Sequence, residues 1–158
     1  MKADGTGRVV IGWVEFVDLP EWRIHRLRAK VDTGARSSAL HVENIRELKN
    51  GRVRFDVRLH RRKTDRRVSV EAPITRKSPV RSSMGHSTTR IFVEARVRIG
   101  ATEHTVELSL VDREKMIFRM LIGRSALAHH YLVDAGRRYL QGKPTRSARR
   151  PRPRAREA

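Results

Sequence analysis

The sequence predicts a mainly β domain, because apolar and polar residues alternate through most of the chain and only one short segment has helical character. Such alternation gives each strand one buried face, as in an antiparallel sheet that covers a core. Glycine and proline fall at breaks between the alternating runs, as turns require. Strands are expected near residues 9–17, 24–32, 53–59, 68–72, 91–99 and 106–110.

Toward the C-terminus, the apolar run Phe118–Ile122 predicts one more strand, and Arg124–His130 predicts a turn or two of helix. The length of 158 residues suits a single core. The last stretch carries seven basic residues, one acidic residue and almost nothing apolar, so it is expected to be disordered. The predicted organisation is therefore a flexible N-terminus (1–8), a folded domain (9–142) and a disordered basic tail (143–158).

The net charge of +19, with a pI near 11.7, indicates an acidic partner: a nucleic acid, the ribosome, an anionic membrane or an acidic peptide. The tail contributes +6, which leaves +13 on residues 1–142, so the folded part is basic as well. The tail is compatible with a solubilising terminus and equally with a tether to RNA or another polyanion.

No cysteine is present, which excludes a disulfide framework and a thiolate zinc site. The polar start leads to a short apolar run that Glu15 and Asp18 interrupt, so neither a signal peptide nor a membrane span is indicated. We expect a cytoplasmic protein without membrane contact. The His-Glu-x-x-His pattern and the glycine-rich phosphate loop are both absent, so no metal and no cofactor are predicted.

Asp32-Thr33-Gly34-Ala35 directly follows the strand-like run 27–31. An acid set by a threonine and a glycine at a strand end is typical of aspartic proteases, in which two carboxylates share one proton. Asp32 is therefore the candidate catalytic acid, with Thr33, Gly34 and Ala35 as its support. The alternative is an ordinary turn in which Asp32 caps its own backbone.

A second signal comes much later, where Phe118–Ile122 enters Gly123 and the short helix. In retroviral-type proteases such an element packs beside the catalytic loop, which makes Ile122 and Gly123 candidate supporting residues. With these runs the chain, over roughly residues 9–140, resembles the bacterial retropepsin-like aspartic protease family that is also labelled ATP-dependent zinc protease. The runs that carry the likeness are IGWVE (11–15), KVDTGARSSALH (30–41), GHS (85–87), FRMLIGR (118–124) and LVD (132–134).

The resemblance implies a retropepsin-like closed β-barrel, one half of an acid protease, with a short helix near the C-terminus. It also implies an aspartic endopeptidase that hydrolyses peptide or protein substrates, glutamate-rich protein tails among them. Only Asp32 carries over as catalytic acid. The family commonly has an acidic residue just before Gly85, where this chain reads Arg81-Ser82-Ser83-Met84.

The second carboxylate is expected from a homodimer, because a two-fold contact places Asp32 against its own copy. Val133-Asp134-Ala135-Gly136 looks like a second motif, but Ala135 lacks the hydroxyl that Thr33 provides. An internal pair of Asp32 and Asp134 is therefore the less favoured arrangement.

Basic residues around the motif favour a carboxylate-rich peptide, and Lys30, Arg36, His86 and Arg119 are the candidate substrate-binding residues. The alternative is that they are solvated strand residues of a basic protein. A different class of function also stays open: a non-catalytic basic β-barrel that binds RNA, the ribosome or another polyanion. The aromatic content of 5% argues against it, because single-strand readers stack bases on aromatic side chains.

Overall fold

The computed structural model describes residues 5, 7–59, 66–81 and 84–142, without the side chains of residues 80 and 81. The basic tail expected at 143–158 lies outside the described residues, as do residues 1–4 and 6 of the N-terminus that we expected to be flexible. No helix in the described part of the chain is long and apolar enough to cross a membrane.

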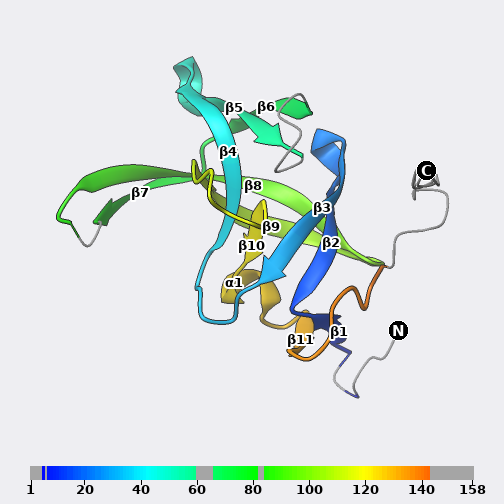
Figure 1. The fold of residues 1–158 in the computed structure, drawn as a ribbon. Coiled ribbons are helices and arrows are strands. Elements are labelled where there is room, and N and C mark those ends of the chain that lie inside the picture. The colour runs from blue at the N-terminus through cyan, green and yellow to red at the C-terminus, as the bar shows by residue number, and fades with distance from the viewer. Residues whose placement is uncertain (1–4, 6, 60–65, 82–83, 143–158) are drawn as a thin grey trace, which may run out of the picture.

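The structure is mainly β, as predicted, with a single short α-helix among the described residues (Figure 1). Two single turns of 3-10 helix, Pro20–Trp22 and Lys49–Gly51, join strands. In chain order the elements are β1 Val9–Gly12, β2 Val14–Leu19, β3 Ile24–Val31, β4 Ser38–Glu47, β5 Arg52–Arg58, β6 Arg67–Pro73, β7 Arg76–Arg81, β8 Ser87–Ile99, β9 Thr102–Val111, β10 Met120–Ile122, α1 Arg124–Leu127 and β11 Tyr131–Asp134.

Six of these strands form a closed barrel, because the pairing runs β10-β3-β2-β8-β9-β4 and then returns from β4 to β10. Strands β5 and β6 continue the sheet beyond β4, and β7 pairs with β8 in a hairpin that projects from the barrel (Figure 1). Strands β1 and β11 form a separate two-stranded sheet. Most pairs are antiparallel, as expected; β1–β11, β3–β10 and β4–β9 are parallel.

The core follows from the alternation in the sequence. On β3, Leu27, Ala29 and Val31 are buried, while Arg28 and Lys30 between them are exposed. The same period on β5 buries Phe55 and its neighbours two residues away. Burial of these apolar faces inside the barrel stabilises it by roughly 25 cal/mol for each Å² removed from water.

The structure differs from the expected elements most clearly in the first strand, in β4 and β7, and in the helix. The first strand is interrupted at Trp13, because β1 pairs with β11 whereas β2 belongs to the barrel. Strands β4 and β7 were not predicted; the outer half of β4 is polar and exposed, so its sequence lacks the period of two. Helix α1 ends at Leu127 and not at His130, because Ala128 leaves helical geometry and His129 has a φ of 71°.

Candidate active site

Asp32 begins the loop that joins β3 to β4. Its Oδ1 accepts a hydrogen bond of 3.0 Å from the Gly34 amide, and its carbonyl accepts one of 3.3 Å from the Ala35 amide. A short polar side chain closes a turn on its own backbone in this way. Asp32 is half-buried, whereas Thr33 and Gly34 are exposed. The local sequence thus makes a tight turn that leaves the outer carboxylate oxygen without a bond to its own backbone.

Strand β10 lies between the two strands that carry this loop. It runs parallel to β3, with Ile122 beside Val31, and antiparallel to β4, with Met120 beside Leu40. The Asp32 amide donates a hydrogen bond of 2.8 Å to the Ile122 carbonyl. The predicted supporting residue Ile122 is therefore in direct backbone contact with Asp32, and β10 holds both ends of the loop.

Gly123 passes against the backbone of the same loop. A Cβ at this position would lie 2.5 Å from the Ser37 carbonyl oxygen and 3.0 Å from that of Ala35, so only glycine allows the approach. The buried amide of Gly123 donates a hydrogen bond of 3.0 Å to the Ser38 hydroxyl. Ser38 was not among the residues expected at the site, because nothing in its neighbourhood of the sequence points to residue 123.

Arg124 closes the loop from outside. Its guanidinium Nη1 donates to the carbonyls of Gly34 at 2.8 Å and Thr33 at 3.2 Å, and its amide donates to the Ala35 carbonyl at 2.8 Å. The next amide, of Ser125, donates to the Arg36 carbonyl at 3.0 Å. Nothing in the sequence around Arg124 predicts these bonds, because a partner 90 residues away leaves no local signal.

The four predicted substrate-binding residues do not lie together. Lys30, at the end of β3, and Arg36, in the loop, are exposed on either side of Asp32. His86 is exposed in the segment between β7 and β8. Arg119 is only 3% exposed, directs its guanidinium to the Met116 carbonyl, and lines a pocket on the flank of β3.

A buried histidine that the sequence did not single out lies on β4 near the site. The His41 side chain is fully buried, and its Nδ1 accepts a hydrogen bond of 3.1 Å from the Arg113 amide. Burial lowers the pKa of His41, and the positive charge of Arg119 lowers it further, against opposing effects of Asp112 and Glu43. The neutral imidazole therefore acts as an acceptor that ties the segment after β9 to β4.

Asp134 lies outside this arrangement. It ends β11 opposite Gly12, in the two-stranded sheet, and not beside the loop of Asp32. Across residues 5, 7–59, 66–81 and 84–142, no hydrogen bond or ion pair joins Asp32 to a second carboxylate. The same residues contain no group of three or more potential metal ligands. One chain thus presents one braced carboxylate.

The comparisons with known proteins agree with this architecture. A family model described as retropepsin-like aspartic endopeptidase RimB matches residues 10–144. A crystal structure of the Legionella pneumophila protein Lpg0085, of unknown function, superimposes with a TM-score of 0.70 at 27% identity and covers 85% of this chain and 98% of that one.

Curated relatives carry a different name. A "Probable alpha-L-glutamate ligase" of Shewanella pealeana is 31% identical over 139 residues, and one of Parasynechococcus marenigrum is 32% identical over 132 residues. These matches cover 86% and 82% of this chain, but only 30% and 28% of the relatives, so the chain spans less than a third of their length. The match over residues 10–144, on a barrel with this loop, shows that the chain belongs to the RimB-like family of retropepsin-like aspartic endopeptidases.

Proposed function

We propose that the protein is an aspartic endopeptidase whose active site forms when two chains bring their Asp32 side chains together. The observation that carries this proposal is the bracing of the Asp32 loop: its backbone is held by Ile122, Gly123 and Arg124 while the carboxylate stays accessible. A turn that merely connects two strands does not need so many contacts from a distant segment. Such bracing supplies the preorganisation that acid–base catalysis requires.

The chemistry follows from two carboxylates at hydrogen-bond distance. Two like charges so close cannot both ionise, and the pair therefore holds one proton. The ionised carboxylate takes a proton from water, which attacks the scissile carbonyl carbon, while the protonated carboxyl donates to the carbonyl oxygen. Proton transfer to the amine then breaks the C–N bond. The hydroxyl of Thr33, which is exposed beside Asp32, would supply a hydrogen bond across the pair.

A homodimer supplies the second carboxylate more simply than Asp134 does. An isologous two-fold contact sets each residue near the axis against its own copy. Thr33 and Gly34 are exposed at the tip of the loop, so a second chain can approach Asp32 there. Asp134 belongs to another sheet, where it ends β11 opposite Gly12.

For the substrate we propose a peptide rich in carboxylates, in the cytoplasm. Lys30 and Arg36 place two exposed cations beside Asp32, which favours acidic residues near the bond that is cut. The glutamate in the name of the curated relatives points to the same class, since a product of glutamate ligation is a chain of carboxylates. A tail of consecutive glutamates on a protein is therefore the first substrate to test.

The central experiment compares Asp32→Asn with Asp134→Asn on a reporter peptide that ends in consecutive glutamates, with the products identified by mass spectrometry. Asp32→Asn is expected to lower kcat by about 10²–10⁴-fold, because the amide can neither activate water nor share the proton. Asp134→Asn, which removes the matching carboxylate of the other turn, is expected to keep normal activity. Cleavage by Asp32→Asn at the wild-type rate would refute the aspartic mechanism.

Mixing tests the dimer. Wild type and Asp32→Asn are mixed in equal amounts and allowed to exchange subunits. If each active site needs Asp32 from both chains, only the wild-type dimers are active, and activity is about a quarter of that of the same amount of wild type. If each chain has its own complete site, about half remains. Asp134→Asn in the same mixture serves as the control and should cause no loss. Sedimentation under assay conditions should show the dimer; an active monomer would contradict the proposal.

Polyanion binding without catalysis is the second candidate, and the net charge of +19 is the observation that favours it. The large apolar side chains exposed in the described residues are Ile45, Met84 and Ile117, none of which is aromatic. A surface without exposed rings is poorly suited to stacking bases. The same Asp32→Asn protein decides the point: it should lose cleavage and keep any binding to RNA.

A further inference from the structure

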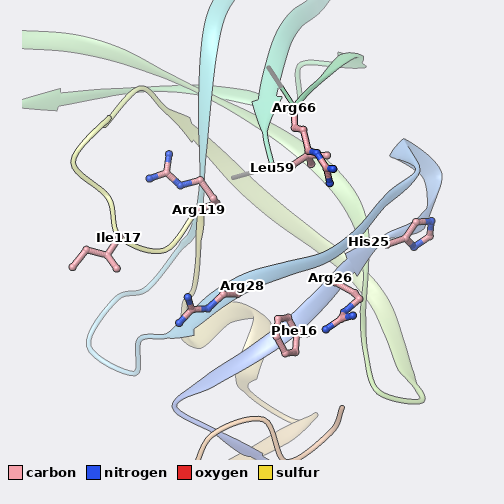
Figure 2. Close-up of a pocket in the computed structure, with 8 residues that line it drawn as sticks. All are labelled: Phe16, His25, Arg26, Arg28, Leu59, Arg66, Ile117 and Arg119. Atoms are coloured by element: carbon pink, nitrogen blue, oxygen red, sulfur yellow. The ribbon is translucent and has the colours of Figure 1, made fainter. Parts of the chain in front are cut away.

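A pocket of about 360 Å³ on the flank of β3 is lined by four arginines, Arg26, Arg28, Arg66 and Arg119 (Figure 2). They come from separate parts of the chain: two from β3, one from the residue before β6 and one from the segment that enters β10. His25 and three apolar side chains complete the lining, and no carboxylate takes part in it. A concave surface of one sign of charge attracts the opposite charge strongly.

Three arginines of the pocket differ from several arginines elsewhere on the barrel. Within the described residues, no ion pair joins Arg26, Arg28 or Arg66 to a carboxylate. The guanidinium of Arg26 lies 4.9 Å from the centre of the Phe16 ring, and that of Arg28 lies 5.2 Å from the Phe118 ring. In contrast, carboxylates pair with Arg52, Arg54, Arg58, Arg67, Arg76, Arg96 and Arg98.

Aromatic contacts orient a guanidinium without using its N–H groups, which stay available for an anion. Several guanidinium groups around one pocket match a ligand with several carboxylates, since each guanidinium can bind a carboxylate through two parallel hydrogen bonds. The Phe16 ring is already covered by Arg26 and stacks on Tyr139 at 4.6 Å, so it offers no free surface to a base. The pocket therefore suits an acidic peptide better than RNA.

The distance to the active site is set by β3. Arg28 precedes Asp32 by four residues along an extended strand, which corresponds to about 13 Å at about 3.3 Å per residue. An extended peptide of about four residues covers this length. An acidic side chain held in the pocket would thus leave the backbone some four residues away at the Asp32 carboxylate.

We infer that this arginine pocket is a carboxylate-binding subsite, which anchors an acidic stretch of the substrate about four residues from the bond that is cut. The inference rests on the proposed function and adds the residues that select the substrate. It also sets a rule for cleavage: the protein recognises acid at a fixed distance from the scissile bond. Lys30, which lies between Arg28 and Asp32 on β3, then binds the intervening residues.

Binding is measured without catalysis, in the Asp32→Asn protein, by the fluorescence anisotropy of a labelled peptide with four consecutive glutamates. The double variant Arg28→Gln/Arg66→Gln should bind it at least about tenfold more weakly, because charge-assisted hydrogen bonds are lost. Arg96→Gln is the matched control, since Arg96 is paired with Glu103 at 3.3 Å and lies outside the pocket. Circular dichroism and thermal unfolding establish that each variant is folded.

Equal binding by the double variant and the wild type, or an equal loss in Arg96→Gln, would overturn the inference. An RNA oligonucleotide of the same charge forms the second arm, and binding there that is tighter and more sensitive to the double variant would assign the pocket to nucleic acid. In the active protein, moving the glutamates along a neutral peptide should give the highest kcat/KM about four residues from the cut. If the peptide binds through the pocket but no peptide is cleaved, the proposed peptidase function is refuted and the carboxylate-binding site is kept.

Discussion

Two turns of the molecule have the same local structure and different surroundings. In Asp32-Thr33-Gly34 and in Asp134-Ala135-Gly136, the glycine amide donates to the aspartate Oδ1 at 3.0 Å. Each turn follows a strand that pairs in parallel with another strand. The local sequence therefore makes the same turn twice, and only one of the two resembles an active site.

The surroundings are also related. A glycine packs beside each region with no room for a Cβ: Gly123 against the Ser37 carbonyl at 2.5 Å and Gly12 against the Arg137 carbonyl at 2.4 Å. The amide of each glycine bonds to a buried side chain, Ser38 for Gly123 and Glu15 for Gly12. At Asp32 this packing fixes the loop next to the acid, whereas at Asp134 it fastens the end of the chain to β1 and β2. The comparison teaches that the same close packing supports the loop of the candidate acid in one turn and holds the segment after β11 against β1 and β2 in the other.

The largest effect is expected from the two buried acceptors. Glu15 accepts hydrogen bonds from the amides of Gly12, Leu140 and Gln141 at 2.9, 3.0 and 2.8 Å. Glu15→Ala leaves these three donors without an acceptor and should lower the free energy of unfolding by about 3 kcal/mol or more. Ser38→Ala leaves only the Gly123 amide without an acceptor and should lower the free energy of unfolding by about 1–3 kcal/mol. Urea unfolding measures both. Equal losses of stability in the two variants would contradict the view that Glu15 holds a whole segment of the chain whereas Ser38 supports only the Asp32 loop.

Alanine at the two glycines gives the sharpest contrast in activity. Gly123→Ala and Gly12→Ala should each cost about 1–3 kcal/mol of stability, since the new Cβ meets backbone in both places. Gly123→Ala should also lower kcat, because the Asp32 loop must shift, whereas folded Gly12→Ala should keep it. Thermal unfolding and peptide cleavage are measured on the same samples. Normal kcat in Gly123→Ala would mean that the bracing is structural only.

A smaller effect is expected from the arginine beside each turn. Arg124→Ala removes hydrogen bonds to the Thr33 and Gly34 carbonyls and should cost about 0.5–1.5 kcal/mol, with a loss in kcat. Arg137, whose Nε lies 3.8 Å from Asp134, is the matched control and should cost less than about 1 kcal/mol when replaced by alanine. Equal kcat values in Arg124→Ala and Arg137→Ala would show that Arg124 does not support the Asp32 loop for catalysis.

The smallest effect concerns pH. Burial lowers the pKa of His41, on the side of Asp32, and of His104, whose Nδ1 lies 3.4 Å from the Tyr131 hydroxyl on the side of Asp134. In the unfolded chain both take up protons near pH 6.5, so stability is complete above that pH and falls as the pH drops from there toward the lowered folded pKa values.

Unfolding temperatures measured over this interval should decrease with acid. His41→Gln and His104→Gln should each make the decrease less steep, because each removes one group that binds protons more readily in the unfolded chain. A pH dependence that neither variant changes would show that other groups govern it. Kinetics over the same interval should respond to His41→Gln more than to His104→Gln, since only His41 lies on a strand that is joined to the Asp32 loop.

Much of the fold could be predicted because its signal is local. The alternation on β3 predicted which residues face the core, and Asp32-Thr33-Gly34 predicted a turn at the end of that strand. The family resemblance and the mainly β fold are confirmed. Strand β4 was missed because its position between β9 and β5, and not its own pattern, keeps it extended.

The rest of the site could not be predicted, because it depends on contacts between distant segments. Ser38 and Gly123 are 85 residues apart, and Arg124 reaches Gly34 across 90 residues. The grouping of pocket arginines is of the same kind: 36 basic residues are spread through the chain, and only folding shows which of them line one pocket. The homodimer and the acidic substrate stay predictions.

The sequence by itself determined most of the strands, the charge and two turns that each close an aspartate onto a glycine amide, because these depend on residues a few positions apart. Only the tertiary structure decided which of the two turns strand β10 braces. Strand β10 fits between β3 and β4, and Gly123 lets it approach the loop of Asp32 where any side chain would collide with backbone. The physical reason is that backbone contact at this distance depends on packing across the whole barrel, which no short stretch of sequence contains.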